Sequence, residues 1–143
     1  QPTPLPEVMM GATHFDTAKA YLHASLGGWG SAGLDYIEPR ALAEYERWFC
    51  NPESIHAACE DYRASASIDL AHDRESRARS DKVGCDMLVL WGERAVVSRL
   101  FDIMTLWRAQ CSGSLTGQGM ACGHFIGEEL PEETAELLLG FFA

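Results

Sequence analysis

A chain of 143 residues is long enough to form one domain with a hydrophobic core. Its content of 47% hydrophobic and 22% charged residues excludes an intrinsically disordered chain. The formal net charge of -10 argues against nucleic acid as a partner, because phosphate binding needs clustered Lys and Arg side chains.

The N-terminal part of the chain is predicted to be mainly helical. Three prolines among the first six residues predict an extended, non-helical lead-in. Apolar side chains at helical spacing predict a helix over residues 15–26, which the glycine-rich stretch 27–33 ends. Another helix is predicted over residues 38–50, with Pro39 near its start.

Two further segments continue this helical pattern. Asn51 has the side chain of an N-cap, and Pro52 suits the first position of a helix that is predicted to extend to residue 67. Residues 69–82 are highly charged and predict a solvated helix or loop. Residues 1–80 are therefore interpreted as a helical lid with an extended lead-in.

The pattern changes after residue 80. A continuous apolar run at residues 85–92 predicts a strand that is buried on both faces. A helical period follows at 98–111, then a candidate strand at 114–120 and a helix at 131–142 whose first turn is acidic. This alternation of strands and helices is typical of a parallel α/β sheet.

Two strands do not complete such a sheet, because its edges and one helix layer are left without partners. The predicted fold class is therefore α/β, with residues 81–143 forming the C-terminal segment of a larger core of parallel strands and flanking helices.

Cysteine usage indicates the redox setting. The chain has five cysteines, an odd number, and none of them forms a C-x-x-C pair. No pair of histidines shows metal-ligand spacing, so we expect no metal site and no cofactor. Neither a signal peptide nor a membrane-spanning run is recognisable, and we therefore expect a cytoplasmic protein without membrane insertion.

The sequence contains no recognisable nucleophile at a sharp strand-to-helix turn. The stretch "WGSAG" around Ser31 has Trp29 where a small residue is needed, and "GHFIG" has Phe125 at the reactive position. Residues 28–33 spell G-x-G-x-x-G, but a dinucleotide site needs a strand before this motif. A helix is predicted there instead, so we interpret the motif as a turn.

His124 is the candidate catalytic base. It follows the predicted last strand and precedes a C-terminal helix, which is where α/β hydrolases place their histidine. An imidazole accepts a proton from water at cellular pH. In many α/β hydrolases an aspartate follows the penultimate strand in a "WGxxD" pattern, but this chain has Ala95 there. The carboxylate that orients His124 is therefore expected to lie outside this chain.

Tyr62 is a second candidate site residue. Its phenol offers one hydrogen-bond donor from a rigid ring, which suits a leaving halide or an oxyanion in a dry pocket. Packing of the ring with its hydroxyl on the backbone is an equally good interpretation of the sequence. Arg63 beside Asp61 is interpreted as a surface ion pair rather than an anion clamp.

Four segments together resemble the haloacetate (fluoroacetate) dehalogenases. They are "QPTPLPE" at the start, "GGWG" at residues 27–30, "NPESIHAACEDYRASASIDL" at residues 51–70 and "GHF" at residues 123–125. The similarity runs in order over nearly the whole chain. It is most specific in the "IHAACEDYRA" block combined with the final "GHF".

This resemblance implies an α/β-hydrolase core with a helical cap. In that family an aspartate displaces the halide to form an ester, and a histidine-activated water then releases glycolate. His124 is similar to the water-activating base and Tyr62 to the cap tyrosine that holds the halide. Trp29 is similar to a cap tryptophan at the substrate passage.

The resemblance also implies partners. The nucleophilic aspartate, the carboxylate-binding arginines and the orienting acid of the family all precede the position of Gln1. The implied partners are therefore the N-terminal half of the same hydrolase domain, a small haloacid substrate and a second copy in a homodimer. The alternatives are an epoxide hydrolase half, an esterase half, and a non-catalytic interaction module; Ala95 argues against the epoxide hydrolases.

Overall fold

The computed structural model describes residues 4–31 and 33–143, which divide into two compact units. The helical unit comprises Gln1–Leu26 and Glu38–Ser80, and the α/β unit comprises Gly27–Ile37 and Asp81–Ala143. None of the described helices is both long and apolar enough to cross a membrane.

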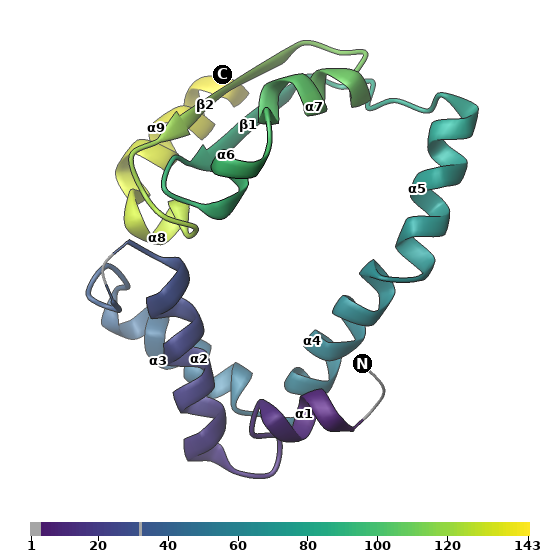
Figure 1. The fold of residues 1–143 in the computed structure, drawn as a ribbon. Coiled ribbons are helices and arrows are strands. Elements are labelled where there is room, and N and C mark those ends of the chain that lie inside the picture. Colours follow the sequence, from purple (N-terminus) through teal and green to yellow (C-terminus); the bar gives the residue numbers. More distant parts are fainter. Residues whose placement is uncertain (1–3, 32) are drawn as a thin grey trace. The chain divides into compact units, whose positions relative to one another are not determined.

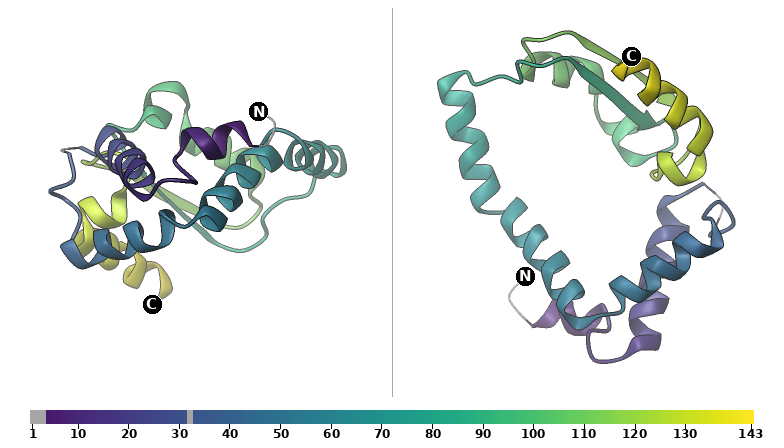
Figure 2. Two further views of the ribbon diagram at one scale, coloured as in Figure 1. Left: turned by 90° about the horizontal axis from the view of Figure 1, so that it is seen from below. Right: turned by 180° about the vertical axis from the view of Figure 1, so that it is seen from behind.

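The helical unit is built from helices joined by short connections (Figures 1 and 2). They are α1 (Leu5–Met9), α2 (Phe15–Trp29), α3 (Pro39–Phe49), α4 (Pro52–Ser65) and α5 (Ile68–Arg79), and α2 extends into the α/β unit at its end. The predicted start of α4 is confirmed, because the Asn51 side chain accepts a hydrogen bond from the Glu53 N–H at 2.9 Å. Glu38 caps α3 in the same way.

Two sequence-based boundaries in this unit are wrong. Leu5 and Pro6 belong to α1 rather than to an extended lead-in, because a proline in the first helical turn replaces an N–H that would have no partner there. Residues 1–3 of the predicted lead-in lie outside the described residues. Helix α2 continues through Gly27 and Gly28 to Trp29, so glycine does not end it. Residue 32 of the G-x-G-x-x-G stretch also lies outside the described residues.

A small apolar core and two carboxylates hold the helices of this unit together. Ala18, Ile55 and Cys59 are buried against one another at the centre. Glu7 of α1 accepts two hydrogen bonds from the Arg63 guanidinium of α4, at 2.8 and 2.9 Å. Arg63 also bonds to Glu60 within α4, so its partners differ from the Asp61 pairing predicted.

Ion pairs link α1 to α4 and α2 to α3, and both of them lower the pKa of the carboxyl group involved. Hydrogen bonds from Arg63 lower the pKa of the Glu7 carboxyl to about 2, despite the opposing effect of burial. Glu46 of α3 joins Lys19 and His23 of α2, at 2.8 and 2.7 Å. Hydrogen bonds from these two residues lower the pKa of Glu46.

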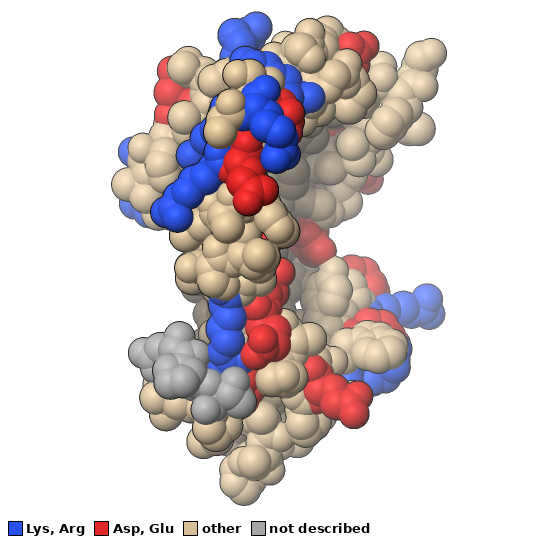
Figure 3. All heavy atoms as spheres, turned by 90° about the vertical axis from the view of Figure 1, so that its right-hand side faces the viewer, with Lys and Arg blue, Asp and Glu red and all other residues tan. Residues whose placement is uncertain are grey.

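The sequence predicts a solvated helix or loop at residues 69–82, and the structure has the solvated helix α5 over Ile68–Arg79. None of its residues is buried, and Figure 3 shows Lys and Arg side chains mixed with Asp and Glu over it. The helix ends at Arg79, and the φ of 59° at the C-cap residue Ser80 lies in the left-handed region that closes many helices.

The α/β unit contains two parallel strands, β1 (Met87–Gly92) and β2 (Leu115–Met120). Met87 pairs with Leu115 and Gly92 with Met120, so both strands end at the same edge. The crossover between them carries α6 (Val96–Leu100) and α7 (Ile103–Gln110). The predicted single helix at 98–111 is thus two helices, because the chain is extended at Phe101 and Asp102 then caps α7.

Helices cover both faces of this strand pair (Figures 1 and 2). Val89 and Trp91 face the side of α6 and α7, where they line a hollow with Val97 and Trp107. The opposite face lies toward α9 (Pro131–Phe142), which follows the short helix α8 (Ile126–Glu129). Only Val89 and Gly92 of β1 are buried, so the predicted burial on both faces is incomplete. Among the described residues, β2 is the only strand paired with β1.

Candidate active site

His124 lies in the loop that follows β2 and precedes α8. Its backbone N–H donates to the Trp29 carbonyl oxygen at 3.0 Å. The imidazole meets the Trp29 and Phe125 rings edge to face, with centroids 5.1 and 5.0 Å away. The imidazole thus contacts two aromatic rings, and His124 is nevertheless exposed to solvent.

The ends of the two strands approach so closely that only glycine fits. A Cβ atom added to Gly92 would lie 1.6 Å from the Gly123 carbonyl oxygen. A Cβ atom added to Gly123 would lie 2.8 Å from both the Gly30 carbonyl carbon and Glu129 Oε1. Backbone atoms cannot move aside as the end of a flexible side chain does. These contacts place the His124 loop directly against the end of β1 and the end of α2.

Glu129 is a site residue that sequence analysis missed. Its carboxylate accepts hydrogen bonds from the Gly123 N–H at 2.8 Å and from the Phe125 N–H at 3.2 Å. It also accepts from the Ser31 N–H at 3.1 Å and from the Ser31 hydroxyl. Burial raises the pKa of this carboxyl, but the hydrogen bonds from Ser31, Gly123 and Phe125 outweigh burial and lower it. The carboxylate is therefore ionised at neutral pH.

The turn after β1 carries no acid that orients the imidazole. Ala95, at the position of the expected aspartate, is only 5% exposed. The neighbouring Arg94 donates from Nη2 to Ser31 Oγ at 2.8 Å. Within residues 4–31 and 33–143, no carboxylate forms a hydrogen bond with the His124 ring. The described residues therefore offer the His124 imidazole as a possible proton acceptor, but no carboxylate that orients its ring.

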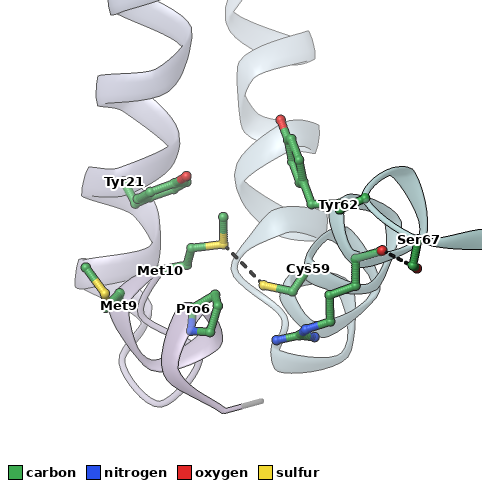
Figure 4. A pocket seen from close by; sticks show the side chains of 9 residues that line it. Pro6, Met9, Met10, Tyr21, Cys59, Tyr62 and Ser67 are labelled. Atoms are coloured by element: carbon green, nitrogen blue, oxygen red, sulfur yellow. Dashed lines mark hydrogen bonds between the residues drawn. The ribbon is translucent and has the colours of Figure 1, made fainter. Parts of the chain in front are cut away.

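Tyr62 belongs to the helical unit and lines a cavity of about 600 Å³ there. Met9, Met10 and Tyr21 line the same cavity, and Figure 4 shows the Tyr62 ring directed upward between the helices with its hydroxyl at the tip. The side chain is 65% exposed, and none of the described residues forms a hydrogen bond with its hydroxyl. The alternative in which the hydroxyl bonds to the backbone is therefore not observed.

The predicted site residues thus fall into two groups. Trp29 and His124 are in contact within the α/β unit, where Trp29 is 56% exposed. Tyr62 belongs to the other unit.

One group of potential metal ligands occurs among the described residues. The ligand atoms of Glu7, His56 and Glu60 lie within 4.8 Å of one another. The Arg63 guanidinium already donates to both glutamates and offsets part of their negative charge. A cation there would have to displace this guanidinium, so the arrangement suits an ion pair better than a metal site.

The chain was compared with known proteins. No protein-family model matches it. It is 33% identical over 143 residues to a fluoroacetate dehalogenase from Burkholderia sp, covering all of this chain and 45% of that protein. It is 29% identical over 102 residues to a soluble epoxide hydrolase from Corynebacterium sp. (strain C12), covering 71% of this chain and 33% of that protein.

The chain is also similar to parts of solved protein structures. A structure from Nostoc sp PCC 7120, assigned to the α/β hydrolases, matches with a TM-score of 0.90 and 43% identity. The match covers 100% of this chain and 46% of the Nostoc chain. The chain has the fold of a C-terminal part of an α/β hydrolase. A structure from Salmonella enterica assigned to the acyltransferases also matches, with a TM-score of 0.85 and 34% identity over 99% of this chain and 44% of that one.

The α/β-hydrolase fold confirms the predicted fold class. The chain spans 45% of the length of the fluoroacetate dehalogenase, 33% of the epoxide hydrolase and 46% of the Nostoc structure. In α/β hydrolases the histidine comes last of the three catalytic residues in chain order. In the described residues, His124 lies in the loop after β2 and before α8 and α9.

Proposed function

We propose that this chain forms the helical cap, over residues 1–80, and the C-terminal core segment, over residues 81–143, of a haloacetate dehalogenase. The observation that carries the proposal is the 33% identity to a fluoroacetate dehalogenase over all 143 residues. The exposed His124 imidazole at the end of β2, in contact with Trp29, supports the role of a base. The N-terminal half of the hydrolase domain, a cytoplasmic location and a homodimer are part of this proposal.

The proposed reaction has two steps. A carboxylate outside these residues attacks the carbon that bears the halogen, a C–O bond forms, and the halide leaves with the electrons of the C–halogen bond. His124 then removes a proton from water, and the resulting hydroxide attacks the ester carbonyl. Glycolate leaves, the carboxylate is regenerated, and the proton on His124 returns to solvent.

Trp29 and Tyr62 have supporting roles in this proposal. Trp29 restricts the imidazole by its edge-to-face contact and borders the substrate passage. The Tyr62 hydroxyl has no partner among the described residues and lines a largely apolar cavity, which supports its role as a donor to the departing halide.

The test uses this chain combined with the N-terminal half of the hydrolase. We expect halide release from fluoroacetate or chloroacetate over many turnovers. His124→Ala should release one equivalent of halide and then stop, because the ester is formed but its hydrolysis is slowed by a factor of about 10² to 10⁴. The ester should be visible as a mass increase of the nucleophile-bearing polypeptide.

His72→Ala is the matched control, because His72 lies on the exposed helix α5. It should keep the wild-type rate. Full-rate turnover by His124→Ala would show that the role assigned to this residue is wrong.

A second candidate is an epoxide hydrolase. The 29% identity to a soluble epoxide hydrolase favours it, whereas Ala95 at the aspartate position argues against it. Parallel assays with an epoxide, an acyl ester and a haloacetate separate these hydrolase reactions. A non-catalytic interaction module would instead be a stable monomer without a partner, which size-exclusion chromatography with a thermal melt would detect.

A further inference from the structure

We propose that Glu129 is the positioning residue for His124. Its catalytic consequence rests on the proposed function, but the positioning itself does not. Glu129 bonds to the backbone N–H groups of Gly123 and Phe125, the two residues that flank His124. The N–H of His124 itself donates to the Trp29 carbonyl. Three consecutive N–H groups are therefore fixed, and only side-chain torsions remain free to move the imidazole.

The same carboxylate also holds the segment that contacts the imidazole. Ser31 donates to Glu129 Oε2 from its N–H and from its hydroxyl, and Ser31 is two residues after Trp29. Arg94, after β1, donates to Ser31 Oγ in turn. Glu129 thus fixes the backbone on both sides of the contact between Trp29 and His124.

An ionised carboxylate is required for this arrangement. All four of its contacts are donors, so both oxygens must accept. In Glu129→Gln the amide oxygen can replace Oε2 and keep the hydrogen bonds from Gly123 and Ser31. The amide NH₂ then occupies the place of Oε1 and faces the N–H of Phe125, which is also a donor. Glutamine should therefore release Phe125 while retaining Gly123.

Amide hydrogen exchange on the full protein tests the positioning. In Glu129→Ala, exchange at Gly123 and Phe125 should rise about tenfold or more, because buried hydrogen bonds to a charged group are lost. In Glu129→Gln the rise should be confined to Phe125. Glu132→Ala is the matched control, since Glu132 is an exposed acid at the start of α9, and it should leave both amides unchanged.

Kinetics test the consequence for His124. Glu129→Ala should slow ester hydrolysis about tenfold or more and leave kcat/KM and the initial one-equivalent burst of halide unchanged, because the ester-forming step is not affected. A variant that merely destabilised the fold would reduce the burst in proportion to turnover. The inference is overturned if exchange at Gly123 and Phe125 in Glu129→Ala equals that of Glu132→Ala, or if burst and turnover fall together.

The two proposals fail in different ways. If wild-type protein releases no halide but Glu129→Ala still raises exchange at Gly123 and Phe125, the proposed reaction is wrong and the positioning by Glu129 stands.

Discussion

Both units of this chain contain a carboxylate that joins segments far apart in sequence, and the two carboxylates have different partners. In the helical unit, Glu7 is bound by the charged guanidinium of Arg63, 56 positions away. In the α/β unit, Glu129 is bound by backbone N–H groups and by Ser31, 98 positions away. A charged side chain fixes the spacing of two helices, whereas backbone donors fix the path of a loop.

The two carboxylates have different partners because helices and loops leave different groups free to form hydrogen bonds. Helices α1 and α4 already have their own backbone hydrogen bonds, so only side chains are available to join them. The loop around His124 has no such regular bonding, and its N–H groups need acceptors from elsewhere. The Glu129 carboxylate lies among those N–H groups and supplies the acceptors that this loop needs.

The largest effect should come from the core of the helical unit. Ile55 is fully buried, and Ile55→Ala should lower the free energy of unfolding by about 3 kcal/mol, because it leaves a cavity beside Ala18 and Cys59. Ile68→Ala, at a 51% exposed position on α5, should cost about 0.5 kcal/mol or less. Urea denaturation measures both, and equal losses would contradict this core.

In the α/β unit, the position most sensitive to substitution is a close backbone approach at Gly123 and not a buried apolar side chain. Gly123→Ala should cost about 2 kcal/mol, because the new methyl group would meet the Gly30 backbone and the Glu129 carboxylate. Gly127→Ala is the matched control, since a Cβ atom there meets nothing within 4 Å. Hydrogen exchange at Gly123 and Phe125 should increase in the first variant alone; protection retained in both would count against the close approach.

A smaller effect is expected at the start of α4. Asn51→Ala removes the acceptor for the Glu53 N–H and should cost about 1 kcal/mol in thermal or urea unfolding. Asn51→Asp retains an acceptor and should stay within about 0.3 kcal/mol of wild type. A helical unit as stable in Asn51→Ala as in Asn51→Asp would show that the cap is not needed.

The last prediction concerns how the stability of the helical unit depends on pH in acid. The folded-state pKa of Glu7 is about 2 against an ordinary value of 4.5, so its stabilising contribution is complete above pH 4.5. That contribution should be lost as pH falls from 4.5 toward 2, when Glu7 takes up a proton. In Glu7→Gln, urea unfolding of the helical unit should depend less on pH over this range; an identical pH dependence would contradict the Arg63 ion pair.

Local signals in the sequence account for much of the fold. Asn51 with Pro52 predicted the start of α4, and the apolar run predicted β1, because capping and burial act over a few neighbouring residues. The loop of His124 between a strand and a helix was predicted from the order of those elements, which the structure has as β2 and α8. Helix α1 was missed because prolines usually interrupt helices, although the first turn tolerates them.

Glu129 could not be predicted from its neighbours. Its donors are four, six and 98 positions away, and no spacing rule links them. The only local signal is an acid shortly after the His124 loop, which equally suits the N-terminus of a helix. Likewise Arg63 was expected to pair with Asp61, two positions before it, whereas folding brings Glu7 to it.

The separation between Ser31 and Glu129 has a consequence for the order of folding. Asp86 and Ser114, at the start of the strand pair, are only 28 positions apart. Closing the 98-position loop costs about 1 kcal/mol more chain entropy than closing the shorter one. We therefore expect β1 and β2 to associate early during folding, and the surroundings of the imidazole to be among the last parts of the polypeptide to become ordered.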